Sequence, residues 1–105
     1  MFQEEKQKLE QYIANNAPLV EPNYLGMNLA DAIHGKEIYL KMKNDSMYAD
    51  YFIFGSNGVL QTEFVLYNSN SNIYIFLVKN GDIHSYERIV NENWFNKYTA
   101  NLKIN

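Results

Sequence analysis

The fold is indicated most clearly by the stretch NIYIFLVKNGDIHSYERIV, which covers residues 72–90. Asn80-Gly81 stands between two apolar runs there. This dipeptide is the strongest short-range signal of a β-hairpin, because both turn residues must accept a positive φ. The sequence therefore predicts antiparallel strands over residues 72–79 and 82–90.

Working outward, further segments with a strand-like or helical pattern flank this hairpin. Three more strands are predicted, over residues 37–43, 46–54 and 59–67, with turns at 44–45, 55–58 and 68–71. Three helices are predicted, over residues 2–16, 29–34 and 92–102. Asn28 and Asn91 are suited to N-cap positions, and Gly35 is the expected end of the second helix.

The turns together predict which residues lie opposite each other in the sheet: Leu77 faces His84, Phe76 faces Ser85, and Leu66 faces Ile73. Alternate side chains then fall on two faces, one of which is almost wholly apolar and must be covered by helices. Tyr51 is predicted to lie on this covered face and Phe52 on the other. The expected fold class is α+β, a five-stranded antiparallel meander with two N-terminal helices and one C-terminal helix on one face. A chain of 105 residues is expected to form one domain over residues 1–105.

The other face of this predicted sheet holds the candidate site. The predicted register puts Asp50 directly beside Glu63, and opposed like charges destabilise a sheet, so stability does not explain them. Aromatic side chains surround the pair, and exposed apolar patches with tyrosines commonly mark binding surfaces. The residues predicted to bind a basic protein partner are Asp50, Glu63, Glu87, Tyr48, Tyr74 and Phe76.

Other interpretations of this face remain open at this point. It is an ordinary solvated face if Lys41 and Lys43 neutralise the acids, or a homodimer seam if two copies stack there. Two adjacent carboxylates also suit a catalytic pair that shares a proton. The connector over residues 18–28 is a further candidate cover.

A second candidate site lies on the last predicted strand, at His84, Tyr86, Glu87 and Arg88. A histidine and an arginine on an antiparallel sheet suit the acid–base group and phosphate clamp of a small ribonuclease. Two features count against it: the register turns Glu87 away from His84 and Arg88, and a net charge of −3 does not favour RNA. A polar edge strand that discourages pairing is the structural explanation.

Composition narrows the function classes further. The chain has no cysteine and two histidines, so we expect no metal centre, and no motif indicates a cofactor. One arginine and an acidic balance disfavour a nucleic-acid partner. The apolar run over residues 73–78 is far below the roughly 20 residues that span a bilayer. With an acidic start unlike a secretory signal, the expected location is cytoplasmic, without a membrane partner.

In overall character the chain resembles the small cytoplasmic immunity proteins of bacterial toxin systems, such as those of contact-dependent inhibition. The resemblance is carried by the short acidic domain, the predicted acid pair with tyrosines, and the stretch EFVLYNSNSNIYIFLV at residues 63–78. It implies a non-enzymatic inhibitor that binds a cognate, basic, nuclease-type toxin. A phage-encoded inhibitor fits the same features, and a ribonuclease acting through His84 and Arg88 is the alternative function.

Overall fold

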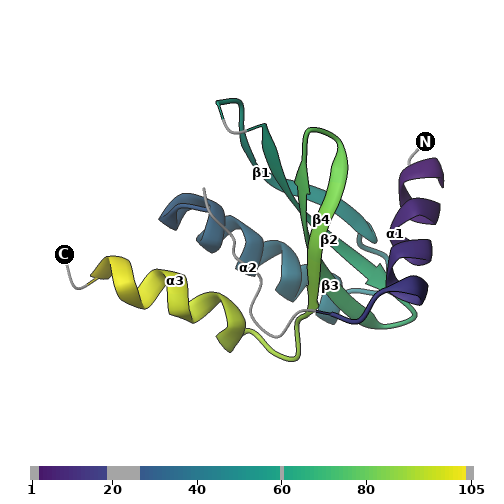
Figure 1. The fold of residues 1–105 in the computed structure, drawn as a ribbon. Coiled ribbons are helices and arrows are strands. Elements are labelled where there is room, and N and C mark those ends of the chain that lie inside the picture. Colours follow the sequence, from purple (N-terminus) through teal and green to yellow (C-terminus); the bar gives the residue numbers. More distant parts are fainter. Residues whose placement is uncertain (1–2, 19–26, 60, 104–105) are drawn as a thin grey trace.

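The computed structural model describes residues 3–18, 27–59 and 61–103 and shows an α+β fold (Figure 1). The elements in chain order are α1 (Gln3–Asn15), α2 (Leu29–Asn44), β1 (Tyr51–Asn57), β2 (Thr62–Ser69), β3 (Asn72–Lys79), β4 (Asp82–Arg88) and α3 (Asn93–Lys103). The strands form one four-stranded antiparallel meander in the order β1-β2-β3-β4. Within the described ranges, no helix is long and apolar enough to cross a membrane.

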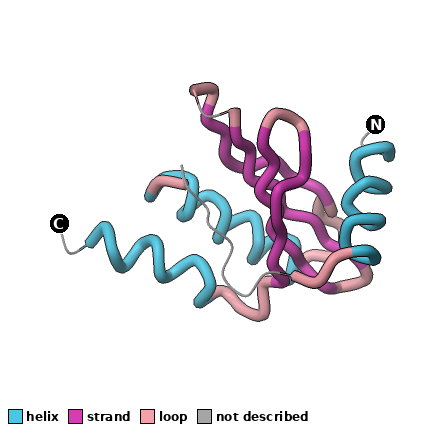
Figure 2. Tube along the Cα trace, viewed as in Figure 1, coloured by secondary structure: helices cyan, strands magenta, loops and turns pink. Residues whose placement is uncertain are grey.

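The sheet lies between two helical layers, with α2 and α3 on one face and α1 on the other (Figure 2). Phe64, Leu66 and Ile75 are buried toward α2 and α3, whereas Val65 and Phe76 are buried toward α1. Both faces are apolar, and each must therefore be covered. The prediction that all helices pack on one face is wrong for α1.

The predicted strand over residues 37–43 is wrong, because these residues belong to α2. Ile38, Leu40 and Met42 alternate with polar residues and so imitate a strand. The buried positions of the whole helix recur instead every three or four residues, as a helix requires: Ala32, Gly35, Ile38, Tyr39 and Met42. Burial of this stripe against the core favours the helical period of 3.6 residues over the two-residue period of a strand.

The predicted start of α2 is confirmed. The Asn28 side chain accepts a hydrogen bond from the backbone N–H of Asp31 at 2.8 Å, as an N-cap does. The predicted end at Gly35 is wrong, and the helix continues to Asn44. The predicted turn at residues 44–45 accordingly ends a helix and joins no hairpin, with the Asp45 N–H bonded to the Lys41 carbonyl.

The first two strands of the sheet lie later in the chain than predicted. β1 begins at Tyr51 and includes Gly55, whereas residues 55–58 were expected to form a turn. The pairing with β2 is irregular between Ile53 and Gly55, and a glycine inside a strand commonly marks such a bulge. The faces of β1 are therefore the reverse of those predicted: Phe52 packs toward α2, and Tyr51 packs toward α1.

The two later hairpins follow the sequence closely. β3 matches its predicted range, and Asn80 and Gly81 both have positive φ, at 52° and 83°. The predicted turn at residues 68–71 narrows to Asn70 and Ser71, which shifts the β2–β3 register by two residues. A shift of two leaves every side chain on its predicted face.

β4 departs from prediction after its first residues. Val78 lies opposite Ile83, but Leu77 lies opposite Ser85, so His84 is an extra residue in a bulge. The predicted pairs of Leu77 with His84 and of Phe76 with Ser85 are wrong for this reason. Tyr86 consequently faces α1.

The remaining expectations concern the ends and the connectors of the chain. α1 and α3 agree with their predicted helices to within a residue at each end. Phe2, residues 19–26 of the predicted connector, and Leu60 lie outside the described residues. The prediction that this connector covers the sheet face therefore concerns residues outside the described ranges.

Candidate functional site

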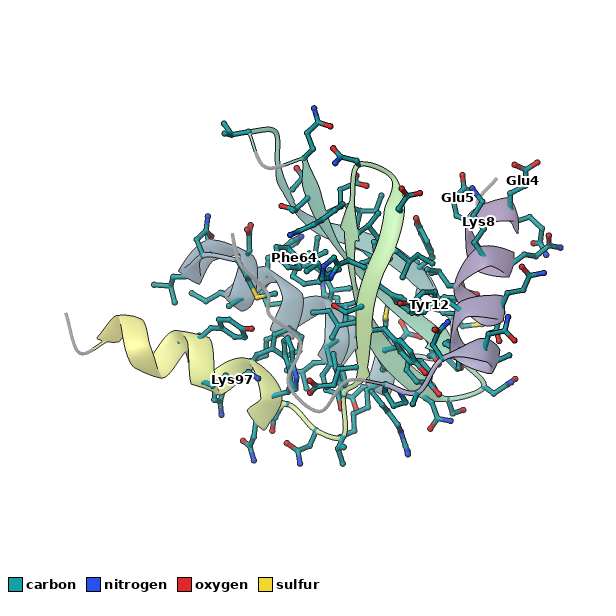
Figure 3. The ribbon with its side chains drawn as sticks, in the orientation of Figure 1. Glu4, Glu5, Lys8, Tyr12, Phe64 and Lys97 are labelled. Carbon is teal, nitrogen blue, oxygen red and sulfur yellow. The ribbon has the colours of Figure 1, made fainter. Side chains whose placement is uncertain are left out.

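The sheet face that was predicted to be open is covered by α1. Leu9 is 4% exposed and inserts among Val65, Phe76 and Tyr86. The Tyr67 hydroxyl donates to Glu10 at 2.7 Å, and the Tyr12 hydroxyl donates to the His84 carbonyl at 3.3 Å. In Figure 3 the Tyr12 side chain points from α1 toward the sheet. The apolar side chains that suggested a docking surface thus form a second core.

The aromatic residues of the predicted site lie in this core or on the opposite side. Phe76 is 0% exposed and stacks on Tyr86 with ring centroids 5.4 Å apart. Tyr74 packs partly buried beside them. Tyr48 packs against the other core, with the Lys41 ammonium 5.8 Å from its ring centroid. The fully buried Phe76 offers no surface to a partner.

The predicted acidic residues are also separated. Asp50 precedes β1, and its carboxylate pairs with Lys6 of α1 at 2.8 Å. Glu63 lies opposite Ser56, so the predicted Asp50–Glu63 pair is wrong. Glu87 lies on the face toward α3, where burial and then the charge of Glu87 raise the pKa of Tyr98 to about 12.

A different acidic site is built where the amino-terminal half of α1 meets the sheet. A groove of about 310 Å³, called the α1 groove here, is lined by Glu5, Lys8, Leu9, Tyr51, Ile53, Glu63, Val65, Val78, Gly81 and Ile83. Its floor is apolar side chains of the sheet. Glu5 and Lys8 lie at the amino-terminal end of α1 (Figure 3).

Two carboxylates of the α1 groove act on the same group. Burial raises the pKa of Tyr51, and the charges of Glu5 and Glu63 raise it further. Among the residues that the structure describes, no cationic nitrogen lies within 4.0 Å of the carboxylate of Glu5 or Glu63, although Lys8 lines the same groove. The groove therefore presents two carboxylates over an apolar floor, and within the described residues no ion pair neutralises either of them.

Glu63 is the one predicted site residue in this groove, and Glu5 was missed. The sequence predicts the helix that carries Glu5 but assigns that helix to the other face. A signal was present, because Val65, Val78 and Ile83 make the outer face more apolar than a solvated face needs. A covering helix accounts for that excess.

The residues of the predicted ribonuclease site are spread along β4. His84 is in the bulge, and Arg88 is four residues further on, roughly 13 Å along an extended strand. Arg88 lines a separate cleft to which His84 does not contribute. The structure does not bring the two side chains together around one phosphate-sized space.

No other catalytic arrangement is evident in residues 3–18, 27–59 and 61–103. These ranges hold no group of three His, Cys, Asp or Glu side chains that would bind a metal ion. Comparison with known proteins adds no constraint, because no protein-family model, curated protein or solved structure matches the chain. Function is therefore inferred from geometry and charge.

Proposed function

We propose that this protein is a non-enzymatic inhibitor that binds a basic protein, as an immunity protein that neutralises a nuclease-type bacterial toxin does. The observation that carries the proposal is the α1 groove. There, Glu5 and Glu63 lie over an apolar floor with no described cation within 4.0 Å. The net charge of −3 supports the same partner class.

The groove suits a long basic side chain of a partner. A lysine or arginine can lay its aliphatic stem on the partly exposed Val78 and Ile83 and place its charged end near the carboxylates. Nucleases carry basic surfaces for their phosphate substrate, and complementary charge raises the rate of encounter with such a surface. Binding there blocks access of nucleic acid to the toxin.

The other predicted contacts enter this proposal differently. Asp50 lies beside α1 in its ion pair with Lys6, so it adds to the local field but is already partly neutralised. A homodimer through the predicted sheet face is not proposed, because α1 covers that face. The ribonuclease alternative is not proposed either, since His84 and Arg88 are apart.

The first experiment identifies the partner and then measures the role of the groove. Tagged protein is used to capture partners from an extract of its source organism, and the recovered partner is purified and titrated by calorimetry. Glu5→Gln with Glu63→Gln should weaken a one-to-one complex at least tenfold, as loss of charged interface contacts does. The inhibitor should also suppress nuclease activity of the partner.

Glu4→Gln with Glu37→Gln is the matched control, since it removes the same charge from exposed positions outside the groove. Its affinity should stay within about twofold of wild type, because exposed surface charges outside a direct contact contribute little at physiological salt. Equal weakening by both variants would show that affinity depends on the net charge of the protein and not on the groove. Full affinity in the groove variant, or a partner that is not basic, would refute the proposal.

A further inference from the structure

A second hollow, called the end cleft here, is lined by the carboxyl end of α2, the β2–β3 turn and the end of β4. Its volume is about 520 Å³. The lining residues are Tyr39, Met42, Lys43, Asn44, Ser46, Asn68, Ser71, Asn72, Ile73, Arg88, Ile89 and Val90. No residue in the described part of the chain lines both the end cleft and the α1 groove.

The end cleft has a fixed apolar floor. Tyr39, Met42, Ile73 and Ile89 line it and belong to the core between the sheet and α2, each at most 5% exposed. Their positions are set by packing, so the hollow is preformed. A volume of roughly 300–1,000 Å³ with an apolar floor and a few polar groups is typical of small-molecule sites.

The charged residues of the cleft are both cations. Lys43 comes from α2 and Arg88 from β4, and no Asp or Glu is among the described residues that line the cleft. Among the described residues, no carboxylate lies within 4.0 Å of either cation. The guanidinium of Arg88 presents donors in the fork geometry that matches phosphate oxygens.

Two sources of negative charge lie near the cleft and show where in it an anion is most favoured. α2 ends here, and its carbonyl end carries partial negative charge, which Lys43 in the last turn offsets. Burial and then the charge of Glu92 raise the pKa of Tyr39, so Glu92 acts on the Tyr39 side. Positive charge is therefore least compensated at Arg88.

The neutral walls supply hydrogen-bond donors to an anion. The amides of Asn44, Asn68 and Asn72 and the hydroxyls of Ser46 and Ser71 belong to the lining. Each amide donates two hydrogens and each hydroxyl one, and the amide oxygens can accept from a base or sugar. This inventory matches a phosphate group attached to a polar body.

Ser71 provides an additional argument from within the chain. It occupies the second position of its turn with φ of 74°, whereas Gly81 occupies the equivalent position of the next hairpin at 83°. A non-glycine residue in this left-handed region costs about 1 kcal/mol or more. A glycine at this position would make the protein more stable, whereas the serine places a hydroxyl at the cleft.

We infer that the end cleft binds a small phosphorylated molecule about the size of a nucleoside monophosphate, with its phosphate at Arg88 and Lys43. The site is independent of the partner surface at the α1 groove. It assigns a role to Arg88, the single arginine of the chain. It also explains why polar side chains from three distant segments converge over a buried floor.

The test is a titration of the full-length ¹⁵N-labelled protein with AMP, with inorganic phosphate and adenosine as separate arms. AMP should shift the backbone amides of Asn68, Ser71 and Asn72 saturably, and adenosine should leave them in place. Arg88→Gln should weaken AMP at least tenfold, as loss of a charge-assisted contact does. Lys41→Gln, on α2 outside the cleft, should bind AMP as the wild type does.

A second variant separates recognition from folding. Ser71→Gly should raise the melting temperature, because glycine accepts the positive φ, and should still weaken AMP severalfold through loss of the hydroxyl. Absence of saturable shifts into the millimolar range, or equal affinity in Arg88→Gln, would overturn the inference. Equal affinity for inorganic phosphate and AMP would overturn the assignment of a nucleotide-sized ligand.

Discussion

At the scale of single residues, Gly35 decides how closely α2 approaches the sheet. A Cβ atom placed on Gly35 would lie 2.8 Å from Cε2 of Phe54 and 2.9 Å from Cε1 of Phe95. The two rings occupy the space that a side chain would need. The glycine that suggested the end of a helix is therefore inside one, because the sheet and α3 pack against it.

Gly35→Ala should destabilise the protein by about 1–2 kcal/mol, since the overpacking cost of roughly 1–3 kcal/mol exceeds the helix propensity gain of up to about 1 kcal/mol. Urea unfolding followed by circular dichroism measures the change. Gly58→Ala is the control, because nothing lies within 4 Å of its added Cβ, and it should be neutral or slightly stabilising. An unchanged midpoint in Gly35→Ala would show that the rings move aside without cost.

At the scale of elements, α1 packs alone on its face of the sheet and is held there by a small set of contacts. Leu9 is its one buried residue, and Tyr12 and Ile13 pack partly buried against the same cluster. The Tyr67 and Ser69 hydroxyls both donate to Glu10, and Tyr86 donates to the Asn16 carbonyl. Since most helical stability in proteins comes from tertiary packing, α1 depends on these few contacts.

Leu9→Ala should cost about 2–4 kcal/mol, as large-to-small changes in a core do. Hydrogen exchange read by NMR should show faster exchange along α1, with smaller changes in α2. Gln7→Ala, at an exposed position of the same helix, should change stability by less than about 0.5 kcal/mol. An equal increase in the hydrogen-exchange rate of all elements would contradict the expectation that α1 opens independently of the rest of the fold.

Both edge strands of the sheet contain a β-bulge. β1 has a bulge at Phe54, and β4 has a bulge at His84, so the pairing of each edge strand is interrupted. Bulged edges accept further strands poorly, which limits edge-to-edge association. The polar character of β4 at His84 and Arg88 fits this structural role.

At the scale of the whole molecule, tyrosines join the layers and keep their protons. Burial raises the pKa of Tyr39, Tyr51, Tyr67, Tyr86 and Tyr98, and for Tyr98 it does so to about 12 with help from Glu87. In Tyr67 the hydrogen bond to Glu10 adds to the rise. The unfolded chain releases these protons near the ordinary pKa of 10.0.

Stability should accordingly be full below pH 10 and should fall as the pH rises toward 12, because the folded state binds more protons than the unfolded state in that window. Melting temperature against pH, together with tyrosinate absorbance, measures this. Tyr98→Phe should reduce the steepness of the alkaline loss. Tyrosinate that appears near pH 10 in the still folded protein would contradict the prediction.

The candidate site was less predictable than the fold, for a reason that Glu63 illustrates. Its strand and face were predicted, but its acidic neighbour depends on which segment crosses that face. The predicted neighbour, Asp50, required a turn at residues 55–58, and a three-residue error in the start of β2 separates them. The actual neighbour, Glu5, is 58 positions away in the chain and arrives only when α1 docks.

Features that depend on neighbours along the chain follow from the sequence alone. Asn80-Gly81 requires a hairpin, Asn28 caps a helix, and strict alternation sorts the faces of β2 and β3. Three features emerge only in the folded molecule: the helical state of residues 37–43, the positions of the bulges and the face that α1 covers. These depend on burial against distant residues, which overrides local preference when both patterns fit.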